Sequence, residues 1–155
     1  MQYGDAISIL RGIPLFCKLD PAKLNLLAFS STSLTFEEGE ELFREGDPAD
    51  GAYIIEEGKV DVLRGQDGHW VKVGSLGKFD LFGEMALILN QSRSATIRAA
   101  QPLKVLKIDA DVFLRMVTEN PDAALTIMRS LSEKITRLTE SYQELQRHIN
   151  GQANG

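Results

Sequence analysis

The sequence predicts a single-domain α+β protein in which an antiparallel β-roll or sandwich is flanked by helices at both ends. Two changes of pattern along the 155 residues support this fold. In the middle of the chain, short β-forming runs alternate with glycine-containing turns, which is typical of antiparallel sheets. Before and after them, apolar residues recur at helical spacing. The predicted organisation is N-terminal helices over 1–33, a β-roll over 34–109 and C-terminal helices over 110–150.

The composition is that of a soluble globular domain. The chain is 43% hydrophobic and 25% charged, and its apolar runs are too short to span a membrane. A secretory signal is not predicted, and the single cysteine, Cys17, fits a cytoplasmic location and is expected to be a small buried side chain. His69 and His148 lack metal-ligand spacing and are expected to be solvated. The net charge of −5 argues against nucleic acid as a partner.

Local signals predict the first helices and seven strands. Apolar residues over 9–16 predict one or two helical turns, which Gly12 and Pro14 interrupt. Asp20 and Pro21 form a helix start, with aspartate as the N-cap and proline at the first helical position. Glycine in the turns between the strands reverses the chain at low cost. The strands are predicted at 34–36, 41–44, 52–55, 59–63, 71–76, 95–99 and 104–108.

Alternation within the strands predicts which side chains face the core. Val71 and Val73 alternate with Lys72, as in a strand with one buried face, so both valines are predicted to point inward. Val60 is predicted to point inward for the same reason. The turn between these two strands is placed at 66–68.

The last third of the chain predicts two helices. Asp109 can cap the first, and Asn120 followed by Pro121 starts the second, which Gly151 is predicted to end. Apolar residues of the second helix recur at alternating spacings of four and three, which is typical of a coiled coil. They are Ala124, Met128, Leu131, Ile135, Leu138, Tyr142, Leu145 and Ile149. At about 43 Å the helix is longer than the roll, so it either folds back on its own sheet or pairs with a second copy. The strict heptad pattern favours a homodimer through 121–149.

The segment 82–96, FGEMALILNQSRSAT, combines groups suited to one small ligand. Phe82 is predicted to anchor it in the core, and Gly83 to let the backbone turn with its amide exposed. Glu84 and the five residues after it predict a short helix whose first amides point at a bound anion. Arg93 can offer a fork of hydrogen bonds to phosphate oxygens, which the next two backbone amides can complete. Glu84 suits a hydroxyl donor such as a ribose 2′-OH; the alternative is that Glu84 and Arg93 are solvated or form a weak ion pair.

This segment resembles, without a gap, the phosphate-binding cassette of the cyclic nucleotide-binding domain family. That family includes the bacterial catabolite activators, the regulatory subunits of cAMP-dependent protein kinase and the cyclic nucleotide-gated channels. Further similar segments are the IPLF start at 13–19, EEGEELFREGD at 37–47, YIIEEGKVDVL at 53–63 and the helices that begin at Asp111 and Pro121. The resemblance implies a jelly-roll-like β-roll, a short cassette helix and a long dimerisation helix. It also implies a regulatory module that binds a cyclic nucleotide and is not an enzyme.

The resemblance implies how the ligand is held. Arg93 would bind the exocyclic oxygens of the cyclic phosphate and Glu84 the ribose 2′-OH. The amides of Gly83, Ala86 and Ala95 would complete the cradle. The full set of implied ligand-binding residues is Gly83, Glu84, Met85, Ala86, Arg93, Ser94, Ala95 and Thr139.

Recognition of the base depends on two of these residues. Ser94 stands where members that prefer cGMP carry a threonine that helps to read guanine, but serine also occurs there in bacterial members that bind cAMP. In bacterial activators, adjacent hydroxyl residues of the long helix contact adenine, and only Thr139 could do so here. The resemblance therefore favours cAMP and leaves cGMP open. The family often has glycine before the aspartate that precedes the cassette, whereas this chain has Phe79, which predicts a reshaped turn.

The preferred prediction is a cytoplasmic cAMP sensor that signals through a downstream protein. It requires no metal, cofactor, catalytic residue, membrane or DNA. One alternative is a dimeric adaptor that binds no nucleotide, against which the presence of both Glu84 and Arg93 argues. Others are the sensor part of a transcription regulator without its DNA-binding domain, since only four residues follow Gly151, or a roll that binds a cyclic dinucleotide on another face.

Overall fold

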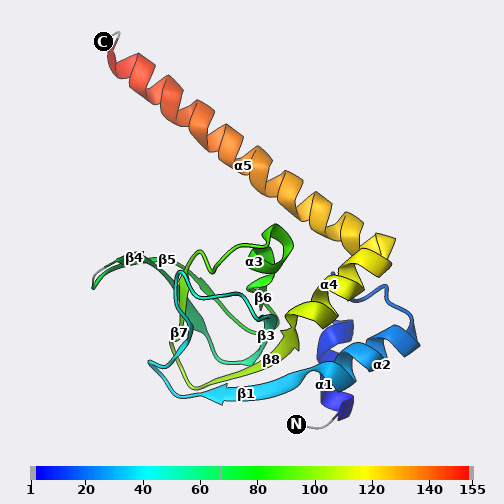
Figure 1. Ribbon diagram of the computed structural model, residues 1–155. Helices are drawn as coiled ribbons and strands as arrows, with labels where there is room; N and C mark the ends of the chain where they lie inside the picture. Colours follow the sequence, from blue (N-terminus) through cyan, green and yellow to red (C-terminus); the bar gives the residue numbers. More distant parts are fainter. Residues whose placement is uncertain (1–2, 67, 154–155) are drawn as a thin grey trace.

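The computed structural model describes residues 3–66 and 68–153 and confirms the α+β class (Figure 1). The helices are α1 Tyr3–Arg11, α2 Pro21–Ser30, α3 Glu84–Leu89, α4 Ala110–Glu119 and α5 Pro121–Ala153. The strands are β1 Thr32–Phe36, β2 Glu41–Phe43, β3 Gly51–Glu57, β4 Val60–Gln66, β5 His69–Leu76, β6 Leu81–Phe82, β7 Thr96–Ala99 and β8 Leu103–Asp109. All seven predicted strands are present, and the short β6 is an addition. Asp67, in the predicted turn, lies outside the described residues.

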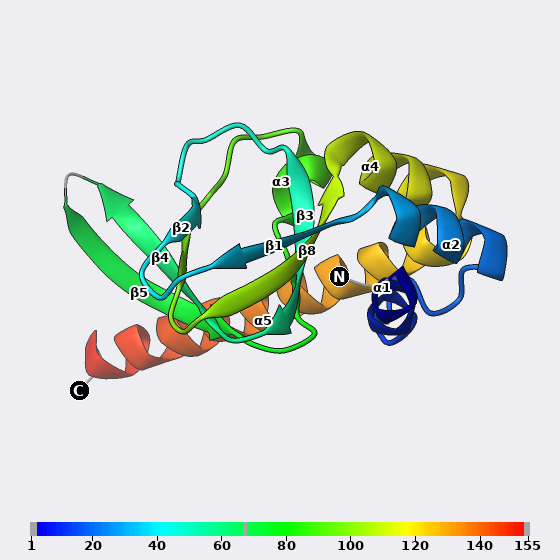
Figure 2. The same cartoon turned by 90° about the horizontal axis from the view of Figure 1, so that it is seen from below.

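Two four-stranded antiparallel sheets form the roll. Their strand orders are β1-β8-β3-β6 and β2-β7-β4-β5. Helices α1, α2 and α4 gather at one end of the roll, and the ribbon of β4 and β5 projects at the other (Figure 2). The site described below lies between these ends, beside α3.

The two central strands of the first sheet, β3 and β8, contribute side chains to cores on both faces. On β3, Tyr53 and Ile55 belong to the core inside the roll, whereas Ala52 and Ile54 pack against side chains of α1, α2 and α4. Strand β8 divides its side chains between the same two cores. Because β3 and β8 lie between the two cores, they fix the helices relative to the inside of the roll.

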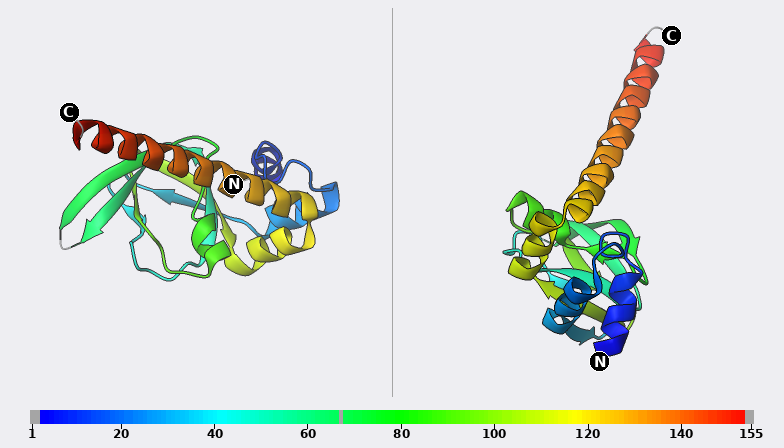
Figure 3. Two further views of the ribbon diagram at one scale, coloured as in Figure 1. Left: turned by 90° about the horizontal axis from the view of Figure 1, so that it is seen from above. Right: turned by 90° about the vertical axis from the view of Figure 1, so that its right-hand side faces the viewer.

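Helix α5 begins next to α4, passes α3 and continues beyond the sheets (Figures 1 and 3). Its 33 residues span about 50 Å. The helix runs through Gly151, so the predicted end at that residue is wrong. A glycine inside a helix costs only about 1 kcal/mol relative to alanine. Among the described residues, no helix has the length and hydropathy needed to cross a membrane.

Two predictions about burial are also wrong. Val71 and Val73 are 62% and 55% exposed, because β5 is the edge strand of its sheet and lies in the projecting ribbon. Alternation identifies two faces of a strand but does not say whether anything covers them. Cys17 is exposed, and its Sγ donates a hydrogen bond to the carbonyl of Pro14 at 3.4 Å.

The first helix, α1, spans Tyr3–Arg11 rather than the predicted 9–16. The predicted starts of α2 and α4 are at the right positions. Asp20 caps α2 by accepting a hydrogen bond from the amide of Lys23 at 2.9 Å. Asp109 occupies the N-cap position of α4 but makes no side-chain capping bond to the described residues. The amide of Ala110 donates to the backbone carbonyl of Asp50 at 3.1 Å. The start of α4 is therefore attached to the beginning of β3.

Phe79 keeps the turn before β6 in the conformation that glycine usually supplies. Its φ is +70°, and the amide of Asp80 donates to the carbonyl of Gly77 at 3.0 Å. Positive φ at the third residue is the requirement of a type II turn. The Phe79 side chain is 51% exposed, so little burial compensates for this backbone conformation.

Phe79→Gly is expected to be more stable than Phe79→Ala by about 1 kcal/mol, because only glycine adopts positive φ without strain. Both variants lose the exposed ring, so the difference between them isolates the backbone term. Urea unfolding of the two variants measures it. Equal stabilities, or a more stable alanine variant, would show that the turn carries no strain.

Candidate functional site

The loop after α3 is fastened to the loop between β2 and β3. The amide of Arg93 donates to the carbonyl of Asp47, and the amide of Gly46 donates to the carbonyl of Arg93, both at 2.8 Å. The hydroxyl Oγ1 of the buried Thr96 accepts from the amide of Glu45 at 2.9 Å. These bonds place the Arg93 side chain inside the protein rather than in solvent.

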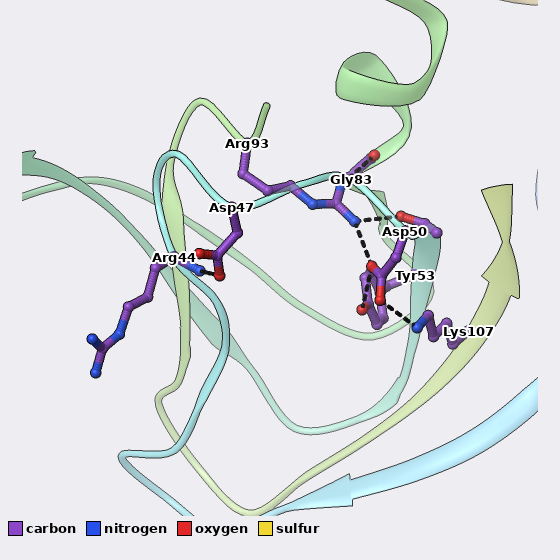
Figure 4. A network of polar contacts seen from close by, with 8 residues as sticks. Arg44, Asp47, Asp50, Tyr53, Gly83, Arg93 and Lys107 are labelled. Atoms are coloured by element: carbon purple, nitrogen blue, oxygen red, sulfur yellow. Dashed lines mark hydrogen bonds and ion pairs between the residues drawn. The ribbon is translucent and has the colours of Figure 1, made fainter. Parts of the chain in front are cut away.

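The guanidinium of Arg93 is enclosed by backbone carbonyls and one carboxylate (Figure 4). Its Nη1 donates to the carbonyl of Gly83 at 2.7 Å. Its Nη2 donates to the carbonyl of Gly51 at 2.6 Å and lies 3.3 Å from Oδ1 of Asp50. The side chain is only 1% exposed. Within the described part of the chain, its Nε is buried and has no hydrogen-bond partner.

Three aromatic rings support the guanidinium. Its Cζ lies 4.0 Å from the ring centroid of Phe43 and 5.8 Å from that of Tyr53. Tyr53 stacks on Phe82, with the ring centroids 5.3 Å apart. Phe82 is buried, so the prediction that it anchors the cassette is confirmed. The rings attract the cation and exclude water from it.

The Arg93 side chain lies so close to the backbone at position 83 that only glycine fits there. Its φ is +82°, and a Cβ at this position would lie 2.8 Å from Nη1 of Arg93. Gly83 is also the N-cap residue of α3, the predicted short helix, which starts at Glu84 as expected. The structure thus brings Gly83 and Arg93 into direct contact. The contact is made by the carbonyl of Gly83, whereas the sequence had suggested a role for its amide.

Glu84 faces a cavity of about 390 Å³ between α3, α5, the loop over 13–15 and the turn at Phe79. Met85 and Lys134 line the same cavity. Burial raises the pKa of Glu84, and a backbone hydrogen bond and the charges of Lys134 and Arg93 offset only part of this rise. Glu84 forms no ion pair with the residues that the structure describes, and a partly buried carboxylate of this kind is suited to accept a hydrogen bond from a neutral hydroxyl.

The other predicted residues lie in different surroundings. Ala86 and Ala95 are half-buried and Ser94 is exposed, all close to Glu84 or Arg93 in the chain. Thr139 is exposed on α5, beyond Lys134, the last residue of α5 to line the cavity. The structure therefore groups the cassette residues and leaves Thr139 apart from them.

Sequence reasoning missed the residues that hold Arg93. Asp50 and Gly51 lie just before a predicted strand, and Lys107 lies within another. Lys107 Nζ lies 2.7 Å from Oδ2 of Asp50. Burial acts to raise the pKa of Asp50, but the hydrogen bond and charge of Lys107, together with the charge of Arg93, keep it below its usual value. A buried arginine needs a hydrogen-bond acceptor. The two aspartates of the DPAD segment before β3 are the feature of the sequence that could have indicated one.

Comparisons with known proteins identify the family of the chain. Residues 33–120, more than half of the chain, match the family described as "Cyclic nucleotide-binding domain". The chain therefore belongs to the cyclic nucleotide-binding domain family. It is related to regulatory domains of cyclic nucleotide-dependent protein kinases and to sensors of the catabolite activator type.

Three relatives illustrate the similarity. The cAMP-dependent protein kinase type II regulatory subunit of Drosophila melanogaster is 34% identical over 110 residues, which cover 70% of this chain and 29% of the relative. The regulatory domain of Toxoplasma gondii PKA with cAMP is 31% identical, with a TM-score of 0.72, covering 84% of this chain and 48% of that chain. A cyclic nucleotide-binding-like protein from Brucella abortus is 37% identical, with a TM-score of 0.63, covering 74% and 98%. The chain thus spans less than a third of the Drosophila relative.

Glu84→Gln is expected to stabilise the protein at neutral pH. A carboxyl whose pKa is raised on folding destabilises the native state above that pKa, and the penalty vanishes once the pH falls below its unfolded pKa. The gain should therefore be present at pH 7 and lost near pH 4 in urea unfolding. Glu140→Gln, at an exposed position on α5, is the control. A gain that persists at pH 4 would assign the effect to something other than the charge.

Proposed function

We propose that this domain is a sensor that binds a cyclic mononucleotide, with cAMP favoured over cGMP. The observation that carries the proposal is the buried guanidinium of Arg93. Its Nε has no hydrogen-bond partner in the described residues. Its Nη1 contacts the carbonyl of Gly83, the residue before Glu84. A buried donor without a partner costs about 1–3 kcal/mol. An anionic oxygen of a phosphodiester removes that cost, and the aromatic rings and carbonyls already fix the cation.

The rest of the ligand follows from the neighbouring groups. Glu84 accepts a hydrogen bond from the ribose 2′-OH, and the amides of Gly83, Ala86 and Ala95 complete the phosphate cradle. Relatives with cAMP in their names support the choice of base, while the cGMP-dependent protein kinase of Eimeria tenella, 31% identical over 118 residues, keeps cGMP as the alternative. Contact of the base with Thr139 requires α5 to lie closer to the roll than it does here.

Signalling requires two states with different affinities for the nucleotide, because equal affinity moves no equilibrium. The cavity beside Glu84 is bounded by α5, so closure of the cassette changes the surface on which that helix rests. A downstream protein then binds differently to the two positions of α5. A nucleotide-free adaptor on the same scaffold is the second candidate.

Calorimetric titration with cAMP, cGMP and cyclic di-GMP tests the ligand. The wild type is expected to bind a mononucleotide, and Arg93→Ala to weaken binding at least tenfold, about 1.4 kcal/mol. Arg98→Ala, which removes an exposed arginine of β7, is the matched control, and thermal unfolding verifies that each variant is folded. A folded wild type that gives no heat with any of the three nucleotides would favour the adaptor.

We also propose that α5 forms a homodimer through its 121–149 segment. Six of the eight seam residues are more than half exposed in the single chain: Met128, Ile135, Leu138, Tyr142, Leu145 and Ile149. In the part of α5 that extends beyond the sheets (Figure 3), the residues at 132–151 are all exposed in the described part of the chain. Pairing with a second α5 would bury this stripe.

Light scattering should give twice the 17.2 kDa mass of the single chain. Leu138→Glu places a charge in the seam and is expected to produce a monomer. Gln143→Glu adds the same charge at an exposed position off the seam and should stay dimeric. A monomeric wild type at micromolar concentration, with and without cAMP, would contradict the proposal.

A further inference from the structure

The carboxylate that contacts Arg93 is shared with a second cation. Oδ1 of Asp50 lies 3.3 Å from Nη2 of Arg93, whereas Oδ2 lies 2.7 Å from Nζ of Lys107 (Figure 4). The Lys107 contact is therefore the shorter of the two. Tyr53 completes the cluster, with its hydroxyl 3.5 Å from Oδ1 of Asp50.

The Asp50 side chain is largely in solvent, so its position depends on the contacts that its carboxylate makes. It is 60% exposed, whereas Arg93 and Lys107 are 1% and 20% exposed. A carboxylate beside a buried guanidinium would be expected to form a close, two-bond pair with it. In this protein Oδ2 is turned to Lys107 instead, and the contact with Arg93 is single and long.

The fold makes room for the lysine. Lys107 lies on β8 directly opposite Tyr53 of β3. A Cβ on Gly51 would lie 2.9 Å from Cε of Lys107 and 2.6 Å from the carbonyl oxygen of Ile108. The absence of a side chain at Gly51 thus lets the Lys107 stem cross β3 and reach Asp50, while the carbonyl of the same glycine holds Arg93.

The charges of the cluster matter for a phosphate ligand. Arg93 and Asp50 together are neutral, so a closed pair would offer a phosphodiester little net attraction. A carboxylate held by Lys107 instead leaves more of the guanidinium charge to the ligand. Because the Arg93 side chain is only 1% exposed, water screens its charge little.

We propose that Lys107 is a positioning residue for the phosphate site: it holds the Asp50 carboxylate away from Arg93 and so keeps the guanidinium charge available to the ligand. This inference rests on the proposed function, since it concerns how strongly Arg93 attracts a cyclic nucleotide. Lys107 acts through Asp50 and need not touch the ligand.

Calorimetry with cAMP on Lys107→Met, Lys107→Arg and Lys104→Met tests this role. We expect Lys107→Met to weaken binding about three- to tenfold and Lys107→Arg to restore it to within about twofold. Lys104, the other lysine of β8, pairs with Glu56 rather than Asp50, so Lys104→Met should bind as the wild type does. Thermal unfolding verifies folding, and Lys107→Gln replaces Lys107→Met if the latter does not fold.

A double-mutant cycle with Asp50→Asn separates action through Asp50 from a general loss of positive charge. If Lys107 works by restraining the carboxylate, Lys107→Met should have little effect in the Asp50→Asn background. An undiminished effect in that background, or a failure of Lys107→Arg to restore binding, would overturn the proposal.

The same titrations distinguish this inference from the proposed function. If cAMP binds the wild type, and Arg93→Ala weakens binding while Lys107→Met does not, Lys107 has no positioning role and the nucleotide site stands. If neither cAMP nor cGMP binds the folded wild type, both proposals fail together.

Discussion

The burial of the Arg93 guanidinium is the constraint on which the arrangement around the site depends. A cation removed from water must be surrounded by acceptors, because an unpaired buried charge is far too costly to keep. The acceptors come from separate parts of the chain: Gly83 before α3, and Asp50 and Gly51 at the start of β3. The residue after β6, the start of β3 and the loop that carries Arg93 are thereby held in one geometry.

The same contacts connect the site to the C-terminal helices. Asp50 faces Arg93 with its side chain, while its backbone carbonyl accepts the first amide of α4. Strand β3 then separates the core inside the roll from the core under α1, α2 and α4. A displacement of Asp50 therefore acts on the cassette and on the start of α4 together, through contacts that are short and direct rather than through a long chain of residues.

Local chemistry in the sequence located most helices and strands but did not show what surrounds them in the fold. Glycine turns located the strands, and Asp20, Asn120 and the run after Gly83 located helix starts, because these signals act over a few residues. The family resemblance selected Glu84 and Arg93. Two of the three acceptors of Arg93, Asp50 and Gly51, come from more than forty residues away in the chain. Neither their contact with Arg93 nor the exposure of Val71 on an edge strand leaves a periodic signal in the sequence, since both depend on tertiary contacts.

Unfavourable features concentrate in the segment that carries the site. Phe79 has a positive φ, Glu84 is a partly buried carboxylate with a raised pKa, and Arg93 keeps a buried donor unpaired within the described residues. Such features persist only where the surrounding structure over-determines them, and here two packed cores do so. A phosphate at Nε and a hydroxyl at Glu84 would satisfy the last two features at once. Ligand binding would then stabilise the folded cassette beyond the contacts it adds, because it also removes costs that the empty site carries.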